Sequence, residues 1–170
     1  MEEFNYSKYC IEQLLKRVPE IHNLNEPFKS YLQDDMESIK DNPHIAHSTY
    51  ESVLCGYYVQ LIKNPTEENK KIIEKIMYLV EDLAGHKNYY VRNVIEVSFC
   101  EPLIPELNPY SDVEKYLLPK ALALAKSIAM LRFGIDANQG WKKLEGLPSF
   151  HTKNPIENEK NNHEENGSKQ

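Results

Sequence analysis

The chain has 170 residues, 41% of them hydrophobic, so it is long enough for one domain with a packed core. Its mean hydropathy of -0.62, and an apolar stretch interrupted by Lys126 and Arg132, exclude an integral membrane protein. The formal net charge of -6 disfavours direct binding to nucleic acid and suits a basic protein partner.

Apolar residues recur at helical spacing in the first part of the chain, where prolines and turn residues separate the segments. We expect three helices here, over residues 3–18, 27–39 and 48–63. Ser48 or Thr49 is expected to cap the third helix. The second half of the second helix is acidic because it carries Asp34, Asp35 and Glu37.

The middle of the chain predicts two helices folded back on each other. Thr66 is expected to cap the first, which ends before Gly85, and Asn88 is expected to start the second. So short a connection makes the helices antiparallel. Pro102 and Pro105 are expected to end the second helix.

A further helix follows an irregular connection. Ser111 and Glu114 have the spacing of a capping box, which predicts a helix start. Pro119 should kink this helix, or separate a short turn from a main helix that begins at 119, and Gly134 should end it. Residues 135–150 are open between a short helix and an arm across the bundle.

These patterns together predict an all-α protein. We expect antiparallel helical hairpins stacked in a HEAT-like or irregular bundle of about six helices, forming a single domain over 1–150. Residues 151–170 have almost no apolar content and are expected to be a disordered polar tail. The first residues have neither a basic start nor an apolar run, so we expect no signal peptide and a cytoplasmic location.

Motifs for catalysis or metal binding are not found in the sequence. Cys10, Cys55 and Cys100 are odd in number and far apart, as expected for free, buried thiols in a reducing compartment. His44 and His47 are the only close pair of possible ligands, and we expect them to be loop and helix-start residues instead. We therefore expect no enzyme, no metal and no cofactor.

Two features favour protein recognition. Eleven tyrosines include doublets at 57–58 and 89–90, and in each doublet one ring should face the core and the other its edge or solvent. The alternative is that the tyrosines are half-buried between helices. The candidate partner-binding residues are Asp34, Asp35, Glu37, Tyr58, Tyr90, Glu96 and Glu101. Glu96 could instead pair with Arg92, one helical turn away.

Residues 90–103 read Y-V-R-N-V-I-E-V-S-F-C-E-P-L. This segment resembles the pattern x-V-x-N-h-h-x-V-x-F-h-E-x-L, with h apolar, of a helical bacterial family. Members look like immunity proteins of contact-dependent growth inhibition and other polymorphic toxin systems. The Val91-Arg92 step is also similar to the second helix of a HEAT repeat.

The resemblance implies a toxin inhibitor without catalytic residues. Its rigid acidic surface would dock on the C-terminal domain of a cognate toxin, commonly a basic nuclease, and cover the toxin's active site. The alternative is a helical-repeat adaptor or regulatory scaffold that binds another cellular protein. The identity of the toxin, the binding face and the oligomeric state stay open at this point.

Overall fold

The computed structural model describes residues 4–25, 28–38, 42 and 44–145. The fold is all-α, as predicted, with one small pair of strands near the end of the described chain. The helices are α1 (Tyr6–Arg17), α2 (Phe28–Ser38), α3 (Ile45–Ser48), α4 (Gly56–Lys63), α5 (Glu67–Ala84), α6 (Tyr89–Ile95), α7 (Glu101–Glu106), α8 (Val113–Tyr116) and α9 (Pro119–Phe133). The expected tail, 151–170, lies outside the described residues.

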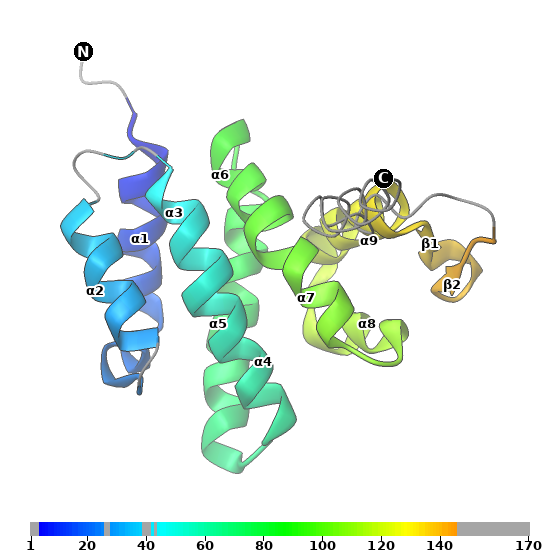
Figure 1. Cartoon of the computed structure of the whole chain (residues 1–170), viewed down its shortest axis with the longest axis horizontal. Coiled ribbons are helices and arrows are strands. Elements are labelled where there is room, and N and C mark those ends of the chain that lie inside the picture. Colours follow the sequence, from blue (N-terminus) through cyan, green and yellow to red (C-terminus); the bar gives the residue numbers. More distant parts are fainter. Residues whose placement is uncertain (1–3, 26–27, 39–41, 43, 146–170) are drawn as a thin grey trace, which may run out of the picture.

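The helices follow one another along the longest axis of the molecule, with α1 and α2 at one end and α9 and the strands at the other (Figure 1). α5 is central, since it packs against α1, α4, α6 and α9. The predicted starts of α5 and α6 are confirmed. The Thr66 hydroxyl accepts the Asn69 N–H, and the Asn88 side chain accepts the Tyr90 and Val91 N–H groups. These caps fix the turns on both sides of α5.

Two of the helical rods contain π-helical turns. Residues 49–55 join α3 to α4, and residues 96–100 join α6 to α7, so that each rod is continuous. The two π-helical stretches pack against each other. Because wider turns of this kind are frequently found at functional sites in proteins, the crossing is the first place to look for a site.

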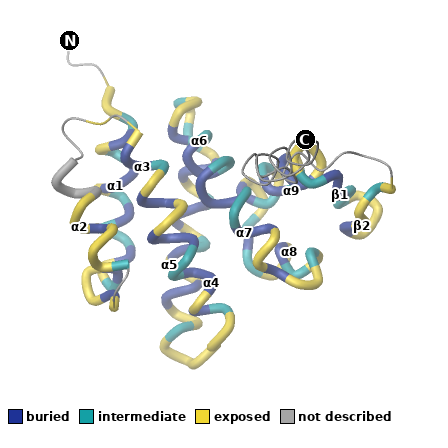
Figure 2. The backbone as a smooth tube through the Cα atoms, viewed as in Figure 1, coloured by how far each residue is buried: buried dark blue, intermediate teal, exposed yellow. Residues whose placement is uncertain are grey.

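The core runs without a break from α1 to the strands (Figure 2). Its largest fully buried side chains include Tyr50, Tyr58, Phe99 and Leu79. All three cysteines are buried and free, as predicted. Gly56 allows close packing, because a Cβ there would lie 2.8 Å from the Cε1 atom of Phe28.

Several predicted helix boundaries are wrong. The third helix begins at Ile45, and the Thr49 hydroxyl bonds back to the Ile45 carbonyl inside the helix instead of capping it. Pro102 does not end the helix that precedes it, because it falls where π-helical turns give way to α7. There the Glu101 N–H bonds to the Glu96 carbonyl, five residues back, so the usual i−4 pattern is already interrupted.

The predicted capping box at Ser111 does not form. A 3₁₀ turn spans Tyr110–Asp112, and no side chain caps the short α8. The Glu114 carboxylate instead accepts the indole N–H of Trp141 and pairs with Lys126. These contacts tie α8 and α9 to the segment that carries the strands.

The second alternative for Pro119 is confirmed, since α9 begins at that residue. Its cap comes from another helix: the Glu81 carboxylate on α5 accepts the N–H groups of Lys120 and Ala121 at 2.9 and 3.1 Å. Gly134 ends α9 in the left-handed conformation, as expected. The following strands, β1 (Ile135–Asp136) and β2 (Lys142–Lys143), pair antiparallel.

Candidate functional site

A groove runs between the α6–α7 rod and α9, and it is called the α7–α9 groove here. It consists of two neighbouring cavities of about 430 and 590 Å³ that share Val97 and Arg132. The first is lined in addition by Tyr89, Asn93, Glu96, Ile128 and Leu131, the second by Glu51, Glu101, Pro102, Pro105 and Phe133. The groove therefore follows the outer side of the crossing between the π-helical stretches.

The groove has an excess of negative charge. Three carboxylates, those of Glu51, Glu96 and Glu101, face one guanidinium, that of Arg132. Arg132 Nε lies 3.6 Å from Glu101 Oε2, an ion pair between α9 and α7. Within the described part of the chain, the carboxylates of Glu51 and Glu96 make neither a hydrogen bond nor an ion pair. Two carboxylates are thus available to a partner.

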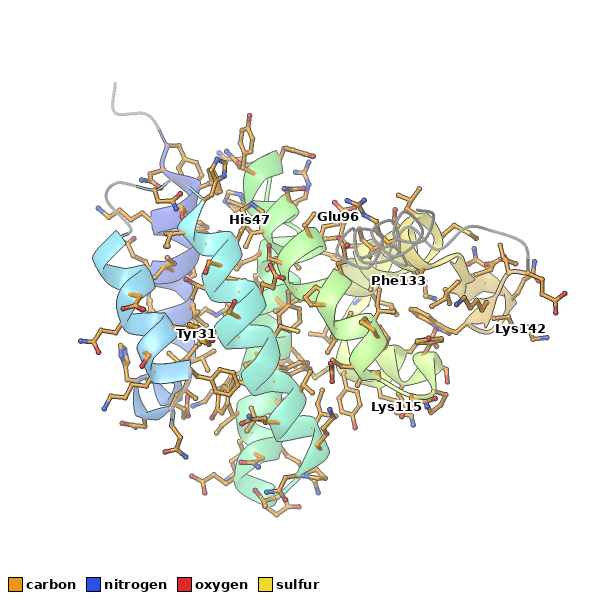
Figure 3. All side chains as sticks on the ribbon, viewed as in Figure 1. Tyr31, His47, Glu96, Lys115, Phe133 and Lys142 are labelled. Carbon is orange, nitrogen blue, oxygen red and sulfur yellow. The ribbon has the colours of Figure 1, made fainter. Side chains whose placement is uncertain are left out.

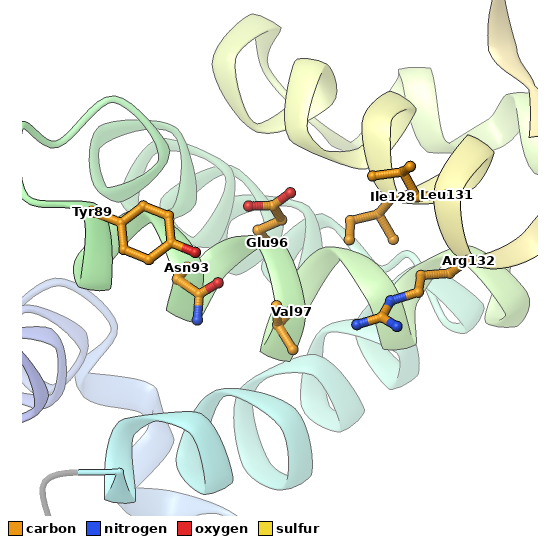
Figure 4. A pocket seen from close by; sticks show the side chains of 7 residues that line it. All are labelled: Tyr89, Asn93, Glu96, Val97, Ile128, Leu131 and Arg132. Carbon is orange, nitrogen blue, oxygen red and sulfur yellow. The ribbon is translucent and has the colours of Figure 1, made fainter. Parts of the chain in front are cut away.

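The apolar lining lies between these charges. Figure 4 shows Tyr89 and Asn93 on one side of the first cavity, Ile128 and Leu131 on the other, and Glu96 between them. Tyr89 and Leu131 are 59% and 64% exposed, and both line the same cavity, so they form part of one exposed apolar surface. The groove therefore combines exposed apolar side chains with uncompensated carboxylates.

The two predicted acidic residues of the α6–α7 rod lie in this groove. Glu96 does not pair with Arg92, whose guanidinium instead donates to the backbone carbonyls of His86 and Lys87. In Figure 3, Glu96 and Phe133 lie over the part of the molecule where the α6–α7 rod meets α9. The structure thus brings Glu96 and Glu101 together with residues of α9.

The prediction that Tyr58 contacts a partner is wrong. Its ring is fully buried against Phe99, and its hydroxyl donates to the Tyr116 carbonyl at 2.6 Å. Its neighbour Tyr57 is half-buried, so this doublet divides as expected. The 89–90 doublet does not, because both rings are more than half exposed.

Tyr90 lies beside the groove in an aromatic network and not within the lining. Its ring stacks on Tyr6 of α1 with centroids 5.3 Å apart, and Tyr6 also contacts His47 of α3. The His47 Nδ1 and Ser98 Oγ atoms are 2.6 Å apart, which connects α3 to the second π-helical stretch. Burial, and secondarily the nearby His44, lower the pKa of His47.

The acidic cluster of α2 is not part of the groove. Asp34 is exposed on α2, and the side chains of Asp35 and Glu37 lie outside the described ones. α2 packs against α3 and the first π-helical stretch, and none of its residues lines either cavity. If α2 affects a partner in the groove, it does so through long-range charge.

The imidazoles of His44 and His47 contact other side chains of the protein. His44 Nδ1 lies 3.0 Å from the Tyr6 hydroxyl. The described residues hold no group of three or more His, Cys, Asp or Glu arranged to bind a metal ion. None of the described helices combines the length and the apolar character that crossing a membrane requires.

The family model described as "Domain of unknown function (DUF7674)" matches residues 11–131. The chain belongs to this family. No curated protein and no solved structure matches the chain. The DUF7674 match begins inside α1 and ends at Leu131, so it includes the three groove carboxylates, while Arg132 and Phe133 follow directly.

Sequence reasoning missed the α9 wall of the groove and Glu51. Leu131 and Arg132 belong to a helix that is apolar on nearly all sides, where no periodic pattern marks an exposed position. Glu51 lies in the first π-helical stretch, where α-helical spacing does not predict which way a side chain points. The one available signal in the sequence was the charge of Arg132 near the end of the apolar helix.

Proposed function

We propose that this DUF7674 protein is an immunity protein that binds a basic bacterial toxin domain and neutralises it by covering the toxin's active site. The observation that carries the proposal is the α7–α9 groove, which joins exposed apolar side chains to uncompensated carboxylates. This is the composition expected where a cationic protein surface binds. The resemblance of residues 90–103 to immunity proteins supports the same reading.

Charge and anchoring would contribute to different steps of binding. The overall charge of -6 favours fast association with a basic partner, and this effect weakens as salt increases. Tyr89 and Leu131 can bury large side chains in the complex, which slows dissociation. The crossing of the two rods supports the groove rigidly, because Phe99 and Cys100 at the crossing are fully buried.

We propose that the protein acts by binding and not by catalysis. The polar side chains that line the groove are three carboxylates, the Arg132 guanidinium, the Asn93 amide and the Tyr89 hydroxyl, and no histidine, serine or cysteine is among the described lining residues. The cysteines are buried, which raises the pKa of the Cys10 and Cys55 thiols to about 12 and leaves little thiolate for nucleophilic attack.

The test is co-expression with the C-terminal domain of the protein encoded next to the gene, scoring cell survival and co-purification. Survival together with a stable one-to-one complex would support the proposal. A neighbouring domain that is harmless, or one that kills cells equally with and without this protein, would refute it. The adaptor alternative would then be pursued by affinity purification from the native host.

A further inference from the structure

We infer that the α7–α9 groove receives an amphipathic helix of the partner, with two basic side chains flanking an apolar stripe. The inference rests on the proposed function for the identity of the partner, but the chemistry of the occupant follows from the groove itself. It therefore has a test that does not need the toxin.

The shape of the groove favours a helix. One wall is the rod from Tyr89 to Glu106, which at helical rise is about 25 Å long. The other wall is α9, where Ile128 and Leu131 lie three residues apart and so share one face. Because the rod and α9 pack against each other, a helix of about four turns can lie along the rod over this contact, as in other helix-in-groove complexes.

The charges fix where the basic side chains of the occupant lie. Glu96 belongs to the first cavity and Glu51 to the second, and neither has a partner among the described residues. One lysine or arginine can therefore reach each carboxylate, one from each half of a helix that lies across the two cavities. A basic partner is required, because an acidic occupant would bring like charges together.

The centre of the groove gives a further restriction. Arg132 borders both cavities and is already engaged by Glu101 at 3.6 Å. A third basic side chain placed there would meet the Arg132 guanidinium and be repelled. The geometry thus points to an occupant that is apolar or acidic where it faces Arg132, with one basic side chain on each side of that point.

A synthetic helix tests this chemistry directly. The probe is a fluorescent 16-residue leucine–lysine peptide with lysines one turn from each end and leucines along one face. Anisotropy titration of the full chain should give saturable binding. Binding should be at least tenfold weaker when the leucines are shuffled off one face, when the lysines become glutamates, or when a central leucine becomes proline.

Variants of the protein separate the groove from net charge. The double substitution Glu51→Lys and Glu96→Lys should weaken peptide binding at least tenfold, and Leu131→Ser about fivefold. The matched control, Glu12→Lys with Glu74→Lys, makes the same charge change on exposed positions of α1 and α5, and should stay within twofold of the unaltered protein. Thermal melts check that every variant is folded.

Three results would overturn the inference: absence of saturable peptide binding, equal weakening by the groove and control variants, or a protein dimer that Leu131→Ser dissociates. The last would mean that a second copy of the chain occupies the groove. The proposed function fails separately. Peptide binding without rescue of cells would refute immunity alone, while rescue that survives Glu51→Lys and Glu96→Lys would refute the groove alone.

Discussion

Replacing Glu81 by alanine should measurably weaken the attachment of α9 to α5. The Glu81 carboxylate caps α9 from a different helix, since it accepts the N–H groups of Lys120 and Ala121. Pro119 has no N–H, and the Leu122 N–H bonds to the Leu118 carbonyl. The donors of this helix start are therefore all accounted for, and Glu81 supplies every acceptor that is not part of the backbone.

The expected loss can be worked out from these contacts. Removing an N-cap acceptor costs typically about 1 kcal/mol, and removing a negative charge from a helix start costs about 0.3–1 kcal/mol more. The Lys120 N–H can turn to water after the substitution, but the Ala121 residue is fully buried, so its N–H loses its partner outright. We therefore expect Glu81→Ala to lower the free energy of unfolding by about 2 kcal/mol, or about 4–8 °C in Tm.

Calorimetry and urea unfolding of three variants check this value. Glu81→Gln keeps one oxygen acceptor and loses the charge, so its loss should be about half that of Glu81→Ala. Glu74→Ala is the matched control, because Glu74 is exposed on the same helix and makes no hydrogen bond or ion pair within the described residues. If Glu81→Ala and Glu74→Ala are equally stable, the cap contributes nothing and the reasoning fails.

Four further outcomes are expected. Tyr58→Phe should lower the free energy of unfolding by about 1 kcal/mol in urea, because the part-buried Tyr116 carbonyl loses its donor; no change would contradict this. Because the pKa of His47 is lowered in the folded state, stability should be complete above about pH 6.5 and fall as the pH drops below it. Urea unfolding at pH 7.5 and 5.5 measures this fall, which His47→Gln should reduce. Deletion of 152–170 should leave Tm within about 2 °C by calorimetry, since polar chain has little to bury; a larger drop would refute this. Charge reversal of Asp34 and Asp35 should weaken partner binding without unfolding the domain, mainly by slowing association in a salt-dependent way. Stopped-flow mixing measures the association rate, and an unchanged rate would contradict this prediction.

Local signals predicted the centre of the fold well. The start of α5 depends on Thr66 and that of α6 on Asn88, and each cap acts within three residues of its own position. A pattern of this range is fully contained in the sequence. The capping box at Ser111 had the same kind of signal and failed, because Trp141 and Lys126 compete for the Glu114 carboxylate.

The candidate site was only half predictable for a related reason. Glu96 and Glu101 were found because they are acidic residues on a recognisable amphipathic helix, whereas Tyr58 was assigned to the surface and is buried. The opposite wall of the groove, with Leu131 and Arg132, comes from α9. The residue that caps α9, Glu81, lies 39 residues from Lys120 in the sequence. Contacts of that range depend on the assembled fold and leave no periodic trace.

The π-helical turns also make the chain sensitive to length in a way that point substitutions would not reveal. Removing one residue from the stretch between Ile95 and Glu101 would leave a rod that can still be helical throughout. The wider turn holds one residue more than an α-helical turn, so it would close into an ordinary one and the following residues would keep their facing. Removing a second residue has no such outlet and would rotate everything after it by about 100° about the helix axis. Leu103 and Ile104, now buried, would then turn away from the core, and Glu101 would leave Arg132. The number of residues in this segment thus carries structural information that their chemical nature alone does not.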